Sequence, residues 1–234
     1  MQNKMLMEKF IVEDIPAVLW GEPSAKIYIY VHGKHGYKEY AEAFAKVAEK
    51  KGYQTLSFDL PKHGERKGAP APCDIWQGIK DLEKIAAFTF GKWTEVNLFA
   101  CSIGAFFALH AYRDKPFKKC LFQSPIIDML WLIKQMMLWF NVSEARLEQE
   151  KRVAPPFETL DWDYYQYVLQ HSINKWPFPT EILYAGKDNL QPVEVMNNFA
   201  TRFGSGLTVS PNSEHPFMGP EDADIVGEWL TKAI

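Results

Sequence analysis

The chain has 234 residues, of which 47% are hydrophobic, 24% charged and 15% aromatic. This length suits one large domain or two small ones, and a chain of this size buries about 70% of its unfolded surface, so its core needs neither a disulfide nor a metal. Lysine and arginine total 26 against 29 acidic residues, which gives a net charge of −3 without a basic block. The composition therefore excludes a disordered chain, and we expect no nucleic-acid partner.

The cysteine pattern and the apolar segments bear on the cellular compartment. The chain has three scattered cysteines, Cys73, Cys101 and Cys120. Their spacing is that of neither a zinc site nor a disulfide framework. The most apolar stretch, residues 129–140, is interrupted by Lys134 and Gln135 and is too short to span a bilayer. The first ten residues carry no apolar run of signal-peptide length. We expect a cytoplasmic protein with no integral membrane segment.

Short β-rich runs alternate with helical patterns along most of the chain. The expected strands are residues 26–31, 53–60, 95–101, 118–124, 180–185 and 207–210. The expected helices are residues 38–51, 74–93, 103–112, 193–203 and 221–233. This alternation predicts an α/β fold with a mostly parallel, twisted sheet and helices on both faces, and residues 8–19 predict a hairpin at one edge.

One long segment breaks this alternation. Between the strand ending near Ser124 and the strand starting at Thr180, the patterns are helical only, at residues 129–140, 143–152 and 162–172. A connection of this length inside a compact domain usually covers a functional site or has structure of its own. We therefore expect an inserted helical cap over residues 128–176. The core domain would comprise residues 1–127 and 177–234.

The most informative segment is a strand, a small-x-Ser-x-small turn centred on Ser102, and an Ala-rich helix. Ala100 and Gly104 are small enough for the chain to reverse sharply, so the Ser102 hydroxyl would project from the carboxyl edge of the sheet. The amide of Ile103 would then point at an oxyanion. Centring the turn on Cys101 would place large residues at the small positions, so we expect Cys101 to be a buried packing residue. The alternative for Ser102 is an ordinary helix N-cap.

At this point the sequence resembles the α/β-hydrolase superfamily. The resemblance covers nearly the whole chain, from about Glu8 to Ala233, with several motifs in the family order. Ala100 stands where the family most often has glycine, and alanine is still small enough for the turn. The resemblance implies the α/β-hydrolase fold and a catalytic triad in the chain order serine, acid, histidine.

The acid and the base are expected downstream of the serine. Asp188 lies in a Gly-x-Asp turn at the end of the strand over residues 180–185, where open α/β sheets collect their site residues. His215 lies between the last strand and the last helix and is the only histidine after Asp188, so it is the only base that this order permits. Asp128 is the alternative acid. The structural alternatives are a turn or capping aspartate and a solvated loop histidine.

Residues 32–36, with the sequence HGKHG, look like the family's His-Gly oxyanion loop. Gly33 permits close backbone approach, and the amide of Lys34 would be the second oxyanion donor beside that of Ile103. We expect His32 to hold the loop by a hydrogen bond. Residues 59–66 resemble a second loop of the family, which is usually structural, so we expect the same of His63.

The expected cap suggests a substrate surface. Met129, Trp131 and Met136 belong to a helix that is too apolar all round for a free surface helix, and we expect one of its faces to line an apolar acyl pocket. The alternative is that these side chains pack on the sheet domain, and a third possibility is a lipid-surface role. No spacing of His and Cys indicates a metal site, and no glycine pattern indicates a phosphate site, so we expect no metal and no cofactor.

Together, these residues predict a serine hydrolase that cleaves a carboxylic ester of a small molecule through an acyl-enzyme. Ser102 would be the nucleophile, His215 the base and Asp188 the residue that orients it. The same triad serves thioester, amide and carbon–carbon hydrolysis, which remain alternatives. A non-catalytic binding protein on a hydrolase scaffold is a further alternative, although such proteins typically lose a triad member and all three are present here.

Overall fold

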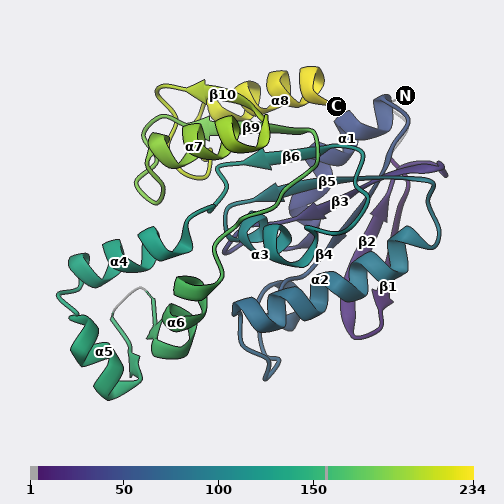
Figure 1. The fold of residues 1–234 in the computed structure, drawn as a ribbon. Helices are drawn as coiled ribbons and strands as arrows, with labels where there is room; N and C mark the ends of the chain where they lie inside the picture. Colours follow the sequence, from purple (N-terminus) through teal and green to yellow (C-terminus); the bar gives the residue numbers. More distant parts are fainter. Residues whose placement is uncertain (1–4, 156–157) are drawn as a thin grey trace.

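The computed structural model describes residues 5–155 and 158–234. An eight-stranded sheet runs through it in the order β1-β2-β4-β3-β5-β6-β9-β10 (Figure 1). The strands of this sheet are β1 (Met7–Val12), β2 (Ile15–Trp20), β3 (Lys26–Val31), β4 (Gln54–Phe58), β5 (Glu95–Cys101), β6 (Cys120–Gln123), β9 (Thr180–Ala185) and β10 (Gly206–Ser210). The β1–β2 hairpin is antiparallel and β2 is antiparallel to β4, whereas all the other neighbours pair in parallel.

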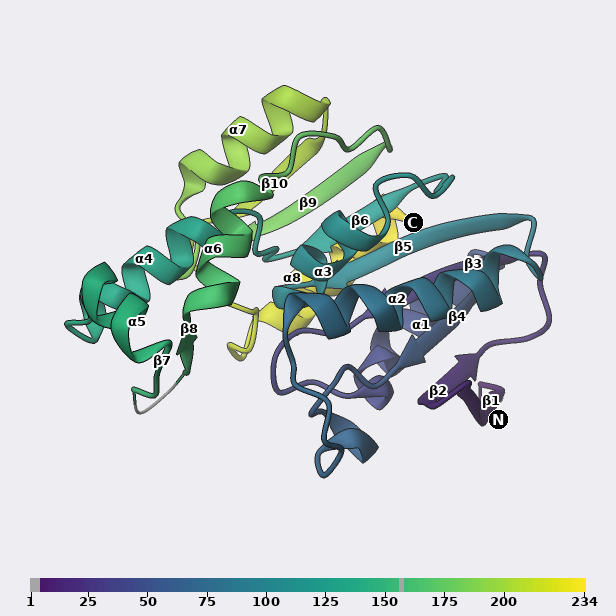
Figure 2. The same cartoon turned by 60° about the horizontal axis from the view of Figure 1, so that its bottom comes forward.

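Helices cover both faces of the sheet (Figure 2). Helices α1 (Glu42–Lys50) and α8 (Asp222–Ala233) pack on one face, and α2 (Ile75–Phe90), α3 (Ile103–Ala111) and α7 (Val193–Phe203) pack on the other. Two short 3₁₀ helices, η1 (Lys38–Ala41) and η2 (Gly64–Arg66), follow β3 and β4. The predicted sheet with helices on both faces is confirmed.

Apolar runs explain why the central strands form where they do. In β3 every residue after Lys26 is buried, as expected for a parallel strand covered on both faces. Asp74 caps the start of helix α2, because its carboxylate accepts a hydrogen bond from the amide of Gln77. Leu82 and Ala86 of this helix are buried in the core. Because the parallel strands point the same way, their carboxyl ends and the loops that follow them meet at one edge.

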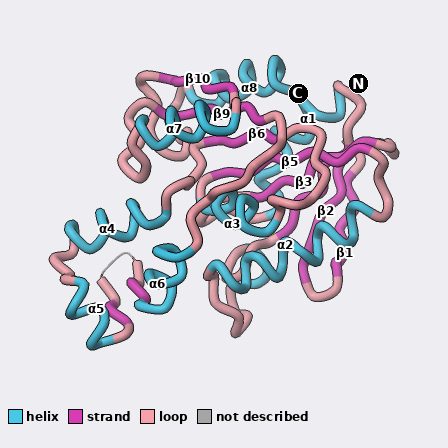
Figure 3. Tube along the Cα trace, viewed as in Figure 1, coloured by secondary structure: helices cyan, strands magenta, loops and turns pink. Residues whose placement is uncertain are grey.

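A helical insertion separates β6 from β9. It contains α4 (Met129–Trp139), α5 (Glu144–Glu150) and α6 (Trp162–Gln170), together with the short strands β7 (Arg152–Val153) and β8 (Leu160–Asp161). The two strands pair antiparallel between α5 and α6, a hairpin that the sequence did not predict (Figure 3). The division at residues 128 and 176 stays a prediction, and residues 1–4 of the expected core and 156–157 of the expected cap lie outside the described residues.

Within residues 5–155 and 158–234, no helix is long and apolar enough to cross a membrane. The same residues hold no cluster of three or more His, Cys, Asp or Glu side chains arranged to bind a metal ion.

Candidate active site

Ser102 occupies a sharp turn between β5 and α3. Its backbone has φ of 52° and ψ of −125°, in the left-handed half of conformational space that residues other than glycine rarely adopt. Small neighbours make this turn possible, because Ala100 is completely buried and a Cβ atom at Gly104 would collide with the carbonyl oxygen of His32. Strained backbone of this kind persists where the surrounding structure holds it, and such positions cluster at functional sites.

The three residues expected to form a triad lie together. Ser102 Oγ is 2.8 Å from His215 Nε2, and His215 Nδ1 is 2.8 Å from Asp188 Oδ2. The Asp188 side chain is completely buried and that of His215 is 8% exposed. An imidazole in this position can accept the serine proton while the carboxylate holds the ring and stabilises the imidazolium.

The geometry favours Asp188 over Asp128 as the acid. The second carboxylate oxygen of Asp188 accepts hydrogen bonds from the amides of Leu190, at 2.7 Å, and Gln191, at 3.2 Å. Asp128 instead caps helix α4, where its Oδ1 accepts a hydrogen bond from the amide of Trp131 at 2.8 Å. The carboxylate of Asp128 therefore stabilises the start of a helix.

Cys101 has the environment of a packing residue. Its side chain is buried, and burial, followed by the charge of Asp188, raises the pKa of the Cys101 thiol to about 12. The thiolate is the nucleophilic form of cysteine, so a thiol that remains protonated at neutral pH is a poor nucleophile.

Two backbone amides are candidates for an oxyanion hole. Ile103 is the first residue of α3, and the first N–H groups of a helix have no acceptor within it. The loop after β3 passes directly against the serine, because a Cβ atom at Gly33 would lie 3.0 Å from the Cβ of Ser102. The next residue is Lys34, whose amide is the second candidate donor and whose half-exposed ammonium forms an ion pair with Glu158 of the helical insertion.

His32 serves the loop rather than proton transfer. It is 1% exposed, its Nδ1 lies 2.7 Å from the carbonyl oxygen of Gly33, and its Nε2 accepts a hydrogen bond from the amide of Leu60 at 3.0 Å. Burial lowers the pKa of His32 to about 4, with the Gly33 hydrogen bond opposing the shift, so the ring is neutral at physiological pH. It joins the loops that follow β3 and β4.

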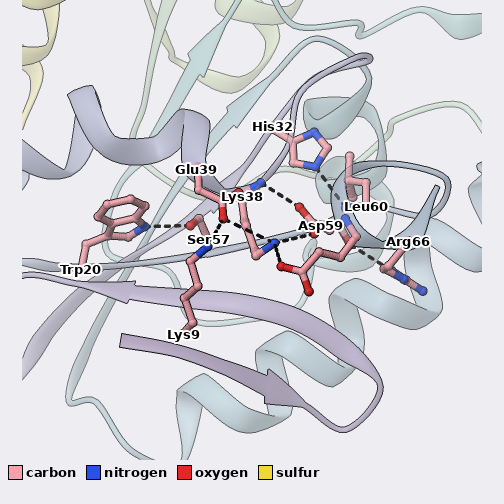
Figure 4. A network of polar contacts seen from close by, with 10 residues as sticks. Lys9, Trp20, His32, Lys38, Glu39, Ser57, Asp59, Leu60 and Arg66 are labelled. Atoms are coloured by element: carbon pink, nitrogen blue, oxygen red, sulfur yellow. Dashed lines mark hydrogen bonds and ion pairs between the residues drawn. The ribbon is translucent and has the colours of Figure 1, made fainter. Parts of the chain in front are cut away.

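A buried ion pair supports the same two loops (Figure 4). The amide and the ammonium of Lys38 donate to the two carboxylate oxygens of Asp59, at 2.8 and 2.9 Å, and the ammonium also reaches Glu65 at 2.7 Å. Burial alone would lower the pKa of Lys38, but the hydrogen bonds to Glu65 and Asp59 outweigh it and raise the pKa. Lys38 was not identified from the sequence, where a lysine at the start of a helical pattern looks like an ordinary surface residue.

The remaining contacts of this loop are structural, as expected. The Nδ1 of His63 lies 2.8 Å from the carbonyl oxygen of Pro61. Burial lowers the pKa of His63 as well, which favours the neutral form of this ring. Arg66 donates to the main-chain oxygen of Asp59 at 3.0 Å.

The loop that carries His215 has its own anchors. The hydroxyl of Ser213 donates to Asp222 of helix α8 at 2.5 Å, and the same carboxylate accepts from the amide of Gly219 at 2.6 Å. On the other side, Gln123 at the end of β6 donates to the carbonyl oxygen of Pro216 at 3.0 Å. Sequence reasoning missed these residues, because an aspartate in a first helical turn and a glutamine at a strand end are both common.

The expected substrate residues all lie on α4. Met129 is buried and lines a cavity of about 300 Å³ between α3, α4, α6 and α7, whereas Trp131 and Met136 are half-buried against the main core. None of the three triad residues lines this cavity. Ser102 itself is only 6% exposed. A role of these α4 side chains in an acyl pocket therefore stays a prediction.

Comparison with known proteins identifies the fold. No protein-family model and no curated protein sequence matches this chain. Among solved structures, Est1E from Butyrivibrio proteoclasticus, solved with ferulic acid bound, matches with a TM-score of 0.76, 14% identity and 96% of each chain covered. The mouse alpha/beta hydrolase domain-containing protein 10 matches with a TM-score of 0.76, 14% identity and 97% of each chain covered.

A third similar structure is the esterase Pf2001 of Pyrococcus furiosus, with a TM-score of 0.67, 20% identity, and coverage of 98% of this chain and 93% of the esterase. These structures and the sheet topology agree that the chain has the α/β-hydrolase fold, which confirms the fold predicted from its motifs.

Proposed function

We propose that this α/β-hydrolase-fold protein is a serine hydrolase that cleaves carboxylic esters of small molecules with an uncharged or apolar acyl group. The observation that carries the proposal is the unbroken chain from Ser102 Oγ through the His215 ring to Asp188, with both contacts at 2.8 Å. The serine lies on a strained strand-to-helix turn, as a nucleophile elbow requires. The contact of Ser102 with His215, and of His215 with Asp188, distinguishes this serine from one that only caps a helix.

In the proposed reaction, Ser102 attacks the ester carbonyl while His215 takes the hydroxyl proton and Asp188 stabilises the resulting imidazolium. The amides of Lys34 and Ile103 stabilise the oxyanion of the tetrahedral intermediate, each lowering the barrier by about 3 kcal/mol. The intermediate expels the alcohol, which receives the proton from His215, and leaves an acyl-enzyme. His215 then deprotonates a water molecule, which attacks the acyl group, and the bond to Ser102 Oγ breaks as His215 returns the proton to that oxygen and the acid is released. No cofactor enters this scheme.

The similar structures support an ester over the other bonds that this triad can cleave. Two of those described above are named as esterases or were solved with a carboxylic acid bound. The net charge of −3 agrees with an uncharged substrate. Thioester, amide and carbon–carbon hydrolysis are the alternatives within catalysis.

The test is the hydrolysis of p-nitrophenyl acetate, butyrate and octanoate by the wild type and by Ser102→Ala. Loss of the nucleophile should lower kcat by about 10⁶-fold, to the background reaction. Ser143→Ala is the matched control, because Ser143 is an exposed helix cap on α5 and its loss should leave kcat unchanged. Equal rates for Ser102→Ala and the wild type would reject the proposal. Faster cleavage of matched thioesters or anilides would instead select one of the alternatives.

A further inference from the structure

Gln191 is a buried residue that the sequence analysis did not identify. It lies three positions after Asp188 and is 0% exposed. Its Oε1 accepts hydrogen bonds from the amides of Ile127, at 3.0 Å, and Asp128, at 2.7 Å. Its Nε2 donates to the carbonyl oxygens of Asp128, at 3.0 Å, and Leu190, at 2.8 Å. The side-chain amide therefore uses both of its acceptor sites and both of its protons.

The backbone around Gln191 controls the orientation of the Asp188 carboxylate. The amides of Leu190 and Gln191 both donate to Oδ1 of Asp188, at 2.7 and 3.2 Å. This leaves Oδ2 for His215, 2.8 Å away. Strand β9 also anchors this turn, because the hydroxyl of Tyr184 donates to the carbonyl oxygen of Gln191 at 2.8 Å. The direction in which Oδ2 points thus depends on where this turn is held.

The segment that binds the Gln191 side chain also binds the serine. The amide of Ile126 donates to the carbonyl oxygen of Ser102 at 3.1 Å, and the next two amides, of Ile127 and Asp128, donate to Gln191. Three successive amides after β6 therefore connect the backbone of Ser102 to the turn of Asp188. A rigid imidazole must bridge these two residues, and a displacement of about 1 Å in such an arrangement can cost about 100-fold in rate.

We infer that Gln191 is a positioning residue of the proposed triad, which sets the spacing between Ser102 and Asp188 through the Ile126–Asp128 segment. This inference rests on the proposed function. Because Asp128 also caps α4, the first turn of the helical insertion and the acid turn share this anchor. A shift of α4 at its first turn acts on Asp188 through the side chain of Gln191.

The principal variant is Gln191→Met, which keeps the length of the side chain and removes all four of its hydrogen bonds. The matched control is Thr180→Val at the opposite end of β9. The buried hydroxyl of Thr180 accepts a hydrogen bond from Trp176 Nε1 at 2.8 Å and donates one to the carbonyl oxygen of Phe178 at 2.9 Å. Both variants should lower Tm, since both remove buried hydrogen bonds. Only Gln191→Met should lower kcat, by about 10- to 100-fold, with KM changed by less than about threefold.

A second variant guards against a misfolded Gln191→Met protein. Gln191→Glu keeps acceptor oxygens for the amides of Ile127 and Asp128, and burial favours the neutral carboxylic acid, which retains one donor. It should therefore fold and lose less of kcat than Gln191→Met. The order of kcat should be wild type, then Gln191→Glu, then Gln191→Met.

A readout that does not depend on hydrolysis is the low-field proton resonance of a histidine Nδ1–H bound to a carboxylate, assigned by its loss in Asp188→Asn. Gln191→Met should weaken or abolish this resonance, and Thr180→Val should preserve it. Wild-type kcat and an intact resonance in Gln191→Met would overturn the inference, as would equal losses of kcat in both variants. If the wild type hydrolyses no ester, the proposed function fails, whereas the resonance still decides whether Gln191 positions Asp188.

Discussion

The carboxyl edge of the sheet and the helical insertion differ in how deeply their ion pairs are buried. At the sheet edge, the Asp59 and Asp188 carboxylates are completely buried and each accepts several hydrogen bonds. In the insertion, the ion pair of Arg146 with Glu150 is exposed. Trp139, at the end of α4, is 50% exposed.

This difference in burial indicates which region should determine each part of the proposed function. A buried polar network with every group paired specifies one geometry, whereas exposed ion pairs contribute little and constrain little. We therefore expect the sheet edge to set the rate of the chemical step and the insertion to set substrate preference.

The largest contrast is expected between the two candidate acids. Asp188→Asn should lower kcat by about 10⁴-fold, because the amide no longer stabilises the imidazolium or fixes its tautomer. Asp128→Asn should change kcat by less than about threefold, because asparagine caps a helix about as well as aspartate. Steady-state hydrolysis of p-nitrophenyl butyrate measures both. A larger loss in Asp128→Asn would move the acid to the root of the insertion and break the division.

Next is the close approach behind the serine turn. Gly104→Ala places a methyl group against the carbonyl oxygen of His32, and overpacking of this kind costs about 1–3 kcal/mol or more of the free energy of unfolding. The matched control is Gly227→Ala in α8, where a Cβ atom meets nothing within 4 Å and should stabilise the helix by up to about 1 kcal/mol. Urea unfolding compares them, and equal stabilities of the two variants would refute the steric argument.

A third effect concerns pH and two buried histidines. Burial lowers the pKa of both His32 and His110 from 6.5 to about 4. Between pH 6.5 and 4 the unfolded chain therefore binds protons before the folded chain does, so the free energy of unfolding falls as the pH falls, by about 3 kcal/mol for each histidine. His110→Leu should remove about half of this loss while the half from His32 remains. Urea unfolding at several pH values measures it, and an unchanged slope would contradict the assignment.

The smallest effect tests the insertion itself. Trp131→Ala on α4 should lower kcat/KM for p-nitrophenyl octanoate about 10-fold more than for the acetate, since the ring would cover about two CH₂ groups of the longer acyl chain and each buried CH₂ contributes about 0.8 kcal/mol. Trp139→Ala is the control, because Trp139 is 50% exposed at the end of the same helix. Equal losses of kcat/KM for all the esters in Trp131→Ala would show that this side chain packs in the protein without contacting the acyl chain.

Much of the sheet domain was predictable from sequence because its signals are local. The bounds of β3, β5, β9 and α7 match the predicted ranges, since mostly apolar strand segments and, for α7, an amphipathic helical pattern end there at turn-forming residues. The meeting of Ser102, His215 and Asp188 was also predictable, because the carboxyl ends of parallel strands converge on one edge.

The features that were missed depend on tertiary contacts. The β7–β8 hairpin has strands of two residues each, which is too short for a periodic pattern. Lys38 and Gln191 acquire their partners only when loops distant in the sequence come together, and a single lysine or glutamine carries no local signal of this. The sequence therefore located the candidate reacting groups but not the residues that hold them in place.

The most direct test of the central claim is to treat the protein with a fluorophosphonate and locate the adduct by peptide mass spectrometry. One adduct, on Ser102, should form in the wild type and in Ser143→Ala. Neither Ser102→Ala nor heat-denatured wild type should be labelled. An adduct on another residue, or labelling of Ser102→Ala to the same extent as the wild type, would contradict the assignment of Ser102 as the nucleophile.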